Sequence, residues 1–314
     1  MCGIAGKIYL GSGIIEERDL ILMSNKIVHR GPDDQGIYIS QDRKVGLAHC
    51  RLAIIDLSAS GHQPMTYKNR YWITFNGEVY NFEEERKKLE RIGYKFRSKS
   101  DTEVILALYD KWGVKCLDHL RGMFAFAIYD IQQQTVFLAR DRMGKKPLKY
   151  FFSPEIFAFA SELKALLTLP EIRSEPDIDI LETYLAYGYV PAPKTGFKNI
   201  YKLEPGHYLT LDLKHKTLNK HCYWEIDFTE KLDIPESEWK TKILQTLEES
   251  TRLRMISNVP IGAFLSGGVD SSSIVAMMTK LSAKPIKTFT IGFSESQYDE
   301  SKYAQIVSDI FHTQ

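Results

Sequence analysis

The sequence predicts an α+β domain built around strands, followed by the beginning of an α/β domain with a parallel sheet. Three observations support this prediction. A chain of 314 residues is long enough for about two domains. Residues 1–213 alternate between short runs typical of strands and two helical patterns. Residues 261–293 have the pattern of strand, glycine-containing loop, helix and strand, an order that calls for a parallel sheet.

Strands and turns dominate the first region. Runs rich in aromatic and β-branched residues predict strands at 123–129, 135–139 and 156–160. Such runs are separated by sequences typical of turns: Gly31-Pro32, Asn76-Gly77 and Glu204-Pro205-Gly206. The region therefore has the signature of a sheet domain.

Two helices are predicted between these strands. The first follows Asn81, with Leu89 and Ile92 expected on one face. The second follows Ser100, because Ser100 and Glu103 have the spacing of a capping box, which we expect to account fully for both residues. Apolar residues recur behind this box at helical spacing, at Val104, Ile105, Leu108, Tyr109 and Trp112.

The chain turns polar at 214–235, which we interpret as a linker between a first domain at 2–213 and a second at 236–314. In the second domain we expect a helix at 239–255, a buried strand at 261–265 and a helix around 274–281. A second strand at 286–293 and a last helix at 303–311 follow. Because a doubly wound domain needs more than two strands, we expect this domain to be incomplete at Gln314.

Composition excludes several classes of function. The chain has 41 Lys+Arg and 40 Asp+Glu, a formal charge of +1, so neither bulk nucleic-acid binding nor attraction to an anionic membrane is expected. No apolar stretch approaches the ~18 residues of a membrane span, and the N-terminus lacks a signal pattern, which predicts a cytoplasmic protein. The cysteines form no CxxC pair, so neither a disulfide framework nor a zinc site is expected; they are Cys2, Cys50, Cys116 and Cys222.

Cys2 is the first candidate for chemistry. Removal of the initiator Met would place a thiol and a free α-amine on one residue. An α-amine has an unperturbed pKa of ~7.7 to 8.0, so it can serve, directly or through water, as the base for its own nucleophile. A cysteine at position 2 is an ordinary feature of many proteins, so this signal gains weight only beside others.

Asn76-Gly77 has two interpretations. It lies between the apolar runs 71–75 and 79–80, so its local sequence favours a type I′ hairpin turn. The alternative is a catalytic role in which the Asn76 amide and the Gly77 N–H donate to a tetrahedral oxyanion, a task that needs fixed donors near the backbone. The two interpretations are compatible.

Two charged residues suggest an amino-acid site. The capping box leaves Asp101 unexplained, and a carboxylate there could hold the ammonium of an amino-acid substrate. Arg51 could clamp the substrate's carboxylate with paired hydrogen bonds. Taken singly, each residue is more often part of a surface ion pair.

The segment 266–272, Ser-Gly-Gly-Val-Asp-Ser-Ser, follows a predicted strand and precedes a predicted helix. Glycines there allow backbone to approach a phosphate, and a helix N-terminus favours anions. Because the chain has no Walker-type motif, transfer of a γ-phosphate by such a loop is disfavoured. A plain glycine turn is the alternative, and the full string argues against it.

Taken in order, these motifs resemble the glutamine-hydrolysing asparagine synthetase family over essentially the whole chain. Met1-Cys2-Gly3-Ile4 is similar to the start of class II glutamine amidotransferase domains. The segment 266–272 resembles the pyrophosphate loop of ATP pyrophosphatases that adenylate a carboxylate. Further segments similar to glutaminase motifs are 29–33, 51–56, 75–81, 100–103, 138–142 and 160–166.

This resemblance implies a fold and a first site. The first domain would have the four-layer αββα N-terminal-nucleophile fold, and the second would be a domain of the ATP-pyrophosphatase type, like adenine nucleotide alpha hydrolases. Cys2 would attack the side-chain amide of glutamine, with Asn76 and Gly77 as the oxyanion hole. Arg51 would bind the α-carboxylate, and Glu78 and Asp101 the α-amine. The full glutamine-binding set would be Arg51, Leu52, Ala53, Ile54, Ile55, Asn76, Gly77, Glu78 and Asp101.

The resemblance also implies a second site. Leu265 and Ile291 would flank adenine, and the intervening loop would cradle pyrophosphate and Mg²⁺, with Asp270 as metal ligand. Aspartate would become β-aspartyl-AMP, and ammonia passing through an internal tunnel would displace AMP to give asparagine. ATP with Mg²⁺ would be a substrate, no prosthetic group is implied, and a homodimer is a further expectation. The ATP-binding set would be Leu265, Ser266, Gly267, Gly268, Asp270, Ser271, Ser272 and Ile291.

Departures and alternatives accompany this resemblance. Met143 and Lys145 stand where the family usually has Phe and Ile, changes we expect to affect only packing, and Asn258 stands where Asp is common. Related enzymes amidate uronic acids of surface polysaccharides, and a non-catalytic glutamine-binding subunit is the alternative from another class. Glucosamine-6-phosphate synthase and amidophosphoribosyltransferase share the Cys-first domain, but 266–272 argues against both. We expect the 314-residue chain alone to act as a glutaminase at most.

Overall fold

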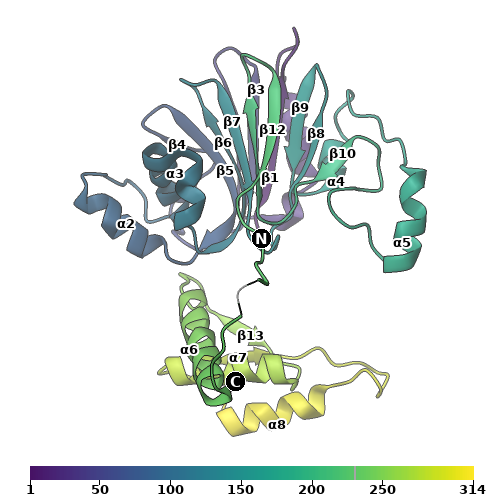
Figure 1. Ribbon diagram of the computed structural model, residues 1–314. Helices are drawn as coiled ribbons and strands as arrows, with labels where there is room; N and C mark the ends of the chain where they lie inside the picture. Colours follow the sequence, from purple (N-terminus) through teal and green to yellow (C-terminus); the bar gives the residue numbers. More distant parts are fainter. Residues whose placement is uncertain (230) are drawn as a thin grey trace. The chain divides into compact units, whose positions relative to one another are not determined.

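Two compact units make up the computed structural model, which describes residues 1–229 and 231–314 (Figure 1). The first unit is Met1–Ile226 and the second is Asp227–Gln314. Glu230, which belongs to the predicted linker, lies outside the described residues.

The first unit is built on two sheets whose strands pair antiparallel (Figure 1). The first sheet runs in the order β10 (Ile200–Lys202), β8 (Lys149–Phe152), β9 (Ile156–Ala160), β1 (Gly3–Tyr9), β3 (Val45–Arg51) and β2 (Asp34–Ile39). The second runs in the order β12 (Thr217–Cys222), β11 (His207–Asp212), β7 (Thr135–Arg140), β6 (Gly122–Asp130), β5 (Tyr71–Val79) and β4 (Met65–Tyr67).

The main core lies between the two sheets. Because successive side chains of a strand point to opposite faces, Ile4 and Ile8 of β1 enter this core while Ala5 faces the helices behind the sheet. Phe157 and Phe159 of β9 contribute large buried side chains to the same core. The alternation fixes the register of β1, and with it the position of Cys2 at its start.

Helices cover the outer faces. Helices α1 (Glu17–Asn25) and α4 (Leu163–Leu166) pack on the first sheet. On the other side α3 (Asp101–Trp112) packs on β4 and β5, and α2 (Phe82–Arg91) packs on α3. The predicted four-layer αββα arrangement is therefore confirmed. The remaining helical segments of this unit are η1 (Val28–Arg30), η2 (Ala59–Gly61), η3 (Gly113–His119), η4 (Ile178–Ile180) and α5 (Leu181–Tyr187).

Sequence patterns missed α1, α4 and α5. In α1, Leu20 and Met23 are buried, but the intervening Ile21 and Leu22 are exposed. Apolar residues therefore surround most of this short helix, and the helical period that would reveal it is blurred. Helices α4 and α5 have four and seven residues, too few for a clear period.

The predicted hairpin turn at Asn76-Gly77 is wrong. Both residues lie inside the nine-residue strand β5, where Asn76 pairs with Ala125 and Gly77 with Phe124 of β6. The local turn preference is overridden because β5 continues along the whole edge of β6 and buries Asn76 completely.

The two predicted helices are present, with corrections at their ends. Ile92 is the C-terminal cap of α2 and is exposed, so it does not share the buried face of Leu89. The Ser100 hydroxyl accepts a hydrogen bond from the Thr102 N–H at 3.1 Å and caps α3 as predicted. Glu103 does not complete a capping box, because its carboxylate accepts hydrogen bonds from the N–H groups of Arg97 and Ser98.

The strands predicted at 123–129, 135–139 and 156–160 are confirmed as β6, β7 and β9. The linker is shorter than predicted, since β12 forms inside 214–235 and pairs with β11. This strand is polar because it lies at the edge of its sheet and is mostly exposed. Polarity alone therefore misplaced the end of the first unit, which extends to Ile226.

The second unit contains the predicted strand–helix–strand pattern. Strand β13 (Gly262–Phe264) leads into α7 (Val269–Leu281) and then into β14 (Lys287–Phe289), which pairs parallel with β13. Helices α6 (Glu236–Arg254) and α8 (Ser301–Phe311) match the other two predicted helices, and both contact α7.

The burial and the length of the strands in this unit differ from the prediction. The first strand was expected to be buried, but Phe264 is 78% exposed, and Phe289 in β14 is also exposed. Only one side of the small sheet meets a core, formed by Leu265, Val275 and Ala304 within the described residues. The strands are also shorter than predicted, because only three residue pairs join them.

Candidate active site

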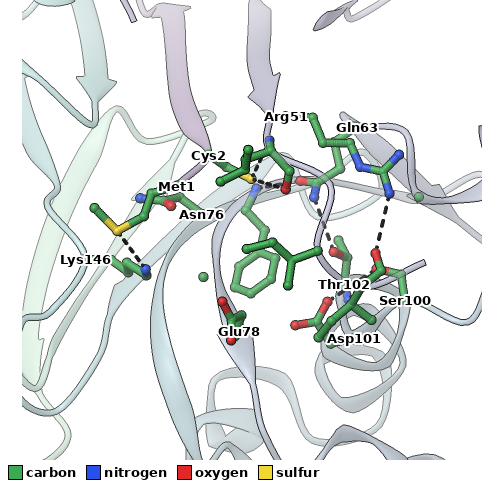
Figure 2. Close-up of a pocket in the computed structure, with 16 residues that line it drawn as sticks. Met1, Cys2, Arg51, Gln63, Asn76, Glu78, Ser100, Asp101, Thr102 and Lys146 are labelled. Carbon is green, nitrogen blue, oxygen red and sulfur yellow. Dashed lines mark hydrogen bonds between the residues drawn. The ribbon is translucent and has the colours of Figure 1, made fainter. Parts of the chain in front are cut away.

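A small pocket in the first unit gathers most of the predicted glutaminase residues (Figure 2). It encloses about 50 Å³ where Cys2, the end of β3, the middle of β5 and the start of α3 converge. Its lining comprises Met1, Cys2, Arg51, Leu52, Ile54, Ile55, Gly61, Gln63, Phe75, Asn76, Gly77, Glu78, Ser100, Asp101, Thr102 and Lys146.

Cys2 is held by the backbone on both sides. Its thiol lies 3.6 Å from the Leu52 carbonyl, and the Leu52 N–H donates to its sulfur at 3.4 Å. The Arg30 guanidinium donates to the Cys2 carbonyl at 3.0 Å. Burial raises the pKa of the Cys2 thiol, so the thiol is protonated at neutral pH and needs a base to become a nucleophile.

The terminal amine beside Cys2 differs from an exposed one. Burial lowers the pKa of the Met1 ammonium. A terminal amine in this recess is therefore neutral over a wider pH range than one in water. A neutral amine next to a protonated thiol is the pairing that an autocatalysed nucleophile requires.

Asn76 is fully buried in β5 and its side chain points into this pocket. Among the described residues, neither its amide nitrogen nor its amide oxygen has a hydrogen-bond partner. An unpartnered buried amide costs free energy, of order 1–3 kcal/mol, unless a ligand pairs with it. The amide nitrogen is therefore able to donate to an oxygen of a bound ligand.

Gly77 must be glycine at its place in β5. A Cβ atom there would lie 2.2 Å from the Met123 carbonyl oxygen and 2.8 Å from the Cα of Phe124. Its backbone can therefore lie against β6 and still line the pocket beside Asn76.

Arg51 lies at the end of β3 and is nearly buried. Its guanidinium donates to the Ser58 carbonyl at 3.1 Å and to the Asp56 carbonyl, which shapes the loop that follows. Leu52, Ile54 and Ile55 of this loop line the pocket as expected. Ala53 does not line it, because its N–H donates instead to the Asp33 carboxylate at 2.8 Å.

Two carboxylates, Glu78 and Asp101, form an anionic wall of the pocket (Figure 2). Asp101 accepts a hydrogen bond from the Val79 N–H at 2.9 Å. Burial, together with the nearby charge of Glu78, raises the pKa of Asp101 to about 6, and burial also raises the pKa of Glu78. Because paired buried carboxylates are destabilised by each other, the recess favours a cation between them.

Gln63 is a pocket residue that sequence reasoning missed. Its carbonyl accepts from the Phe75 N–H at 2.7 Å, and its amide nitrogen donates to the Thr102 hydroxyl at 3.2 Å. One side chain thus ties the neighbour of Asn76 to the neighbour of Asp101. The sequence held no signal for this, because Gln63 is far from both along the chain.

Lys146, the other important omission, is 3% exposed and donates to the Met1 sulfur at 3.0 Å. It sits in the segment where two departures from the family pattern were noted. Met143 and Lys145 are both exposed, so those departures alter the surface and the expectation of a packing change is not met.

The loop 266–272 in the second unit is ordered by its own serines. The Ser271 hydroxyl lies 3.0 Å from that of Ser266 and accepts from the Ser266 N–H at 3.2 Å. Gly267 has a φ of +81°, and a Cβ there would lie 2.5 Å from the Tyr303 backbone. Gly268 precedes the first turn of α7, so the N–H groups of that turn, which have no acceptor within the helix, lie beside this loop.

A hollow of about 320 Å³ lies next to this loop. It brings together Leu265, Ser266, Ser271 and Ile291 of the predicted ATP set, and Phe264 and Phe289 also line it. The other four members do not line it; they are Gly267, Gly268, Asp270 and Ser272. Leu265 is buried under the hollow, whereas Ile291 is exposed.

A resident metal site is not formed by the part of the chain that the structure describes, because no three His, Cys, Asp or Glu side chains there are grouped to hold an ion. Asp270 lies in the first turn of α7 and supplies one carboxylate. One carboxylate plus nucleotide phosphates is a common way to hold Mg²⁺, so the donor set fits a metal that arrives with ATP.

None of the helices in the described residues is long and apolar enough to cross a membrane.

Family models match both units. A glutamine amidotransferase domain model matches residues 1–224, and an asparagine synthase model matches residues 242–314. The first match ends close to the structural boundary at Ile226.

Two curated relatives align with nearly all of this chain. A protein from Methanocaldococcus jannaschii, described as a glutamine-hydrolysing asparagine synthetase, is 41% identical over 100% of this chain and 64% of its own length. Asparagine synthetase (glutamine-hydrolysing) 1 from Bacillus subtilis is 37% identical over 97% of this chain and 48% of its own. The chain thus spans between about half and two thirds of the length of these relatives.

A solved structure supports the fold alone. The glutamine phosphoribosylpyrophosphate amidotransferase of B. subtilis aligns with 94% of this chain and 67% of its own, at 16% identity and a TM-score of 0.51.

Proposed function

The chain belongs to the glutamine amidotransferase family, in the branch that joins this domain to an asparagine synthase domain, and we propose that it acts in glutamine-dependent asparagine synthesis. One observation carries the proposal for the first unit. The thiol of Cys2 shares a buried pocket with the unpartnered amide of Asn76 and with two carboxylates. That arrangement matches a glutamine side-chain amide at one end and an ammonium at the other.

In the proposed first reaction, Met1 is removed and the α-amine of Cys2 takes the thiol proton. The sulfur attacks the side-chain carbonyl carbon of glutamine, and the carbonyl oxygen becomes an oxyanion. Asn76 and the Gly77 N–H would donate to this oxyanion, and the fixed position of β5 keeps both donors oriented. The α-amine returns its proton to the leaving nitrogen, ammonia departs, and water then hydrolyses the thioester to glutamate.

The rest of the pocket would orient glutamine. Arg51 would pair with the α-carboxylate, and the backbone of the 52–55 loop would line the side chain, supported by the position of Leu52, Ile54 and Ile55. Glu78 and Asp101 would hold the α-ammonium, which is the cation that their recess favours.

The second unit would bind ATP, with Leu265 and Ile291 at adenine and the 266–272 loop at the phosphates with their Mg²⁺ near Asp270. An aspartate β-carboxylate oxygen would attack the α-phosphorus and release pyrophosphate, giving β-aspartyl-AMP. Ammonia would then attack the β-carbonyl carbon and AMP would leave, giving asparagine. Ammonia released inside the protein would stay unprotonated, and water would have little access to the adenylate.

The acceptor is proposed from the relatives. The two relatives reported above are described as asparagine synthetases, which favours aspartate over a uronic acid. The intact pocket around Cys2 favours turnover over a non-catalytic glutamine-binding role. We further propose a cytoplasmic location, because the reaction requires ATP and a reduced thiol, and a homodimer as the assembly.

A covalent probe tests the first reaction. The chain lacking Met1 is treated with a glutamine analogue that carries an electrophilic diazoketone, and the modified peptide is identified by mass spectrometry. We expect labelling at Cys2 that L-glutamine prevents, lost in Cys2→Ala and kept in Cys222→Ala, whose thiol is exposed. Labelling at Cys222 alone would sink the proposal.

A product assay tests the second reaction. Asparagine should form from aspartate, MgATP and glutamine in the whole protein. Failure with aspartate together with amide formation from a uronic acid would replace aspartate as the acceptor.

A further inference from the structure

Lys146 is a buried cation that forms no direct ion pair among the described residues. Its side chain is 3% exposed, and within the described residues no carboxylate lies in ion-pair range of its ammonium. Its side chain donates to the Met1 sulfur at 3.0 Å, a weak acceptor for so costly a group (Figure 2). Such an arrangement lowers the stability of the fold, because the desolvation cost of the buried charge is not offset by a direct ion pair.

We propose that Lys146 is a positioning residue that keeps the N-terminal amine of the mature chain unprotonated, so that Cys2 has a ready base. The inference rests on the proposed glutaminase function and assigns a residue that the motifs did not single out. Lys146 would touch neither the thiol nor the leaving group, and it would act through the amine.

Three features of the geometry point to this role. Lys146 and Met1 line the same pocket as Cys2, so the three residues share one small space. The acceptor of the Lys146 ammonium belongs to Met1, the residue that maturation removes. The backbone of Lys146 is fixed as well, because its N–H donates to the Asp141 carboxylate at 2.9 Å.

Like charges in one low-dielectric space disfavour each other's protonated form. Burial, and after it the positive charge of Lys146, lowers the pKa of the Met1 amine, and burial lowers the pKa of Lys146 itself. In the mature chain the amine belongs to Cys2, one residue further on in the same pocket. Removal of Met1 takes away the sulfur that accepts from Lys146. The Lys146 ammonium would then be stabilised only by the other groups of the pocket.

Other charged groups face the same space from neighbouring elements. Arg30 of η1 acts in the same direction as Lys146 on the terminal amine, whereas Glu78 of β5 and the Cys2 thiolate raise its pKa. Asp141, after β7, also favours the charged form of Lys146. The Asp141 carboxylate accepts hydrogen bonds from backbone N–H groups, including that of Phe124 at 3.2 Å, and it acts on Lys146 through its charge without a direct ion pair.

The test is a direct titration of the amine. In the full chain labelled with ¹⁵N-cysteine and freed of Met1, the Cys2 nitrogen is the only cysteine nitrogen that is an amine and not an amide. Its ¹⁵N resonance is followed against pH in wild type, Lys146→Met and Lys146→Arg. The amide signals of Cys50, Cys116 and Cys222 report whether each variant is folded.

Lys146→Met should raise the midpoint of this titration by about one pH unit, while Lys146→Arg, which keeps the charge, should leave it near the wild-type value. The acid limb of the rate of ammonia release should move with it. An unchanged midpoint in a folded Lys146→Met variant overturns the inference. That result is separate from failure of the proposed function, which would show as wild-type chain that releases no ammonia whatever its titration.

Discussion

The conformation predicted for Asn76 from its local sequence differs from the one in the structure. Its dipeptide with Gly77 has the strongest local signal for a hairpin turn, yet both residues lie inside β5. Pairing of both residues with β6 overrides the turn preference, and it buries an amide that has no hydrogen-bond partner among the described residues, as the proposed oxyanion role requires.

Replacement of Asn76 tests its role as a donor. Asn76→Ala should lower kcat for ammonia release by about 10²- to 10³-fold, because one oxyanion donor is lost, with a smaller effect on KM. The matched control is Asn219→Ala on the exposed strand β12, which should leave the rate unchanged. Steady-state kinetics that give equal rates for Asn76→Ala and wild type would contradict the assignment.

Asp101 should make both glutamine binding and stability depend on pH. Its folded pKa of about 6 lies above the ordinary value of 3.8, so the fold penalises the carboxylate. Below the ordinary value the group is protonated in both states and there is no penalty. As pH rises from there to about 6 the unfolded chain loses its proton first, so stability falls, by about 3 kcal/mol in all.

Asp101→Asn removes this penalty and also the carboxylate that would bind ammonium. Urea unfolding should show the variant more stable than wild type, with a larger gain at about pH 7.5 than at about pH 4.5. Its KM for glutamine should rise, and in wild type KM should rise as pH falls through about 6. A variant that binds glutamine normally would remove Asp101 from the site.

At the scale of elements, the contact between β5 and β6 positions the site. Gly77→Ala keeps the backbone N–H but places a methyl group against the Met123 carbonyl. We expect the free energy of unfolding to fall by about 1–3 kcal/mol and ammonia release to fall with it, because β5 must shift. Gly196→Ala is the control, since no atom lies within 4 Å of its added Cβ, and it should change neither measurement.

Elements with a strong local period were the ones that sequence could predict. Helix α3 carries buried apolar residues along its length behind a Ser100 cap, and β6, β7 and β9 are dense in aromatic and branched residues. Helix α1 was missed because Ile21 and Leu22 break its pattern, and β12 was taken for linker because an exposed edge strand has no apolar face. The secondary structure of such segments depends on tertiary pairing, which the local sequence does not reveal.

The pocket residues also fall into those that the sequence could predict and those that it could not. Cys2, Asn76, Glu78 and Asp101 belong to motifs whose order could be read, and the fold brings them to one pocket. Gln63 and Lys146 could not be found by spacing, because each reaches the pocket across the fold from a distant segment. A motif predicts a continuous loop as lining, but it does not show which of its residues face the pocket. The Ala53 N–H donates to Asp33, and Ala53 lies outside the lining.

At the scale of the whole molecule, each unit has its own core. We therefore expect two unfolding transitions in differential scanning calorimetry. Gly77→Ala should lower the midpoint of one transition, and Gly267→Ala, whose Cβ would meet the Tyr303 backbone, should lower the midpoint of the other. If either substitution moved both transitions equally, the two units would unfold as one.

The other proposed roles depend on hydrolysis of glutamine by Cys2 in the pocket of the first unit. The most direct measurement is ammonia release from L-glutamine by the chain lacking Met1, beside Cys2→Ala, with removal of Met1 verified by mass spectrometry. We expect ammonia and glutamate in equal amounts from wild type and none above background from Cys2→Ala. Equal release by both proteins, or none from a folded wild-type chain with a free Cys2 amine, would contradict it.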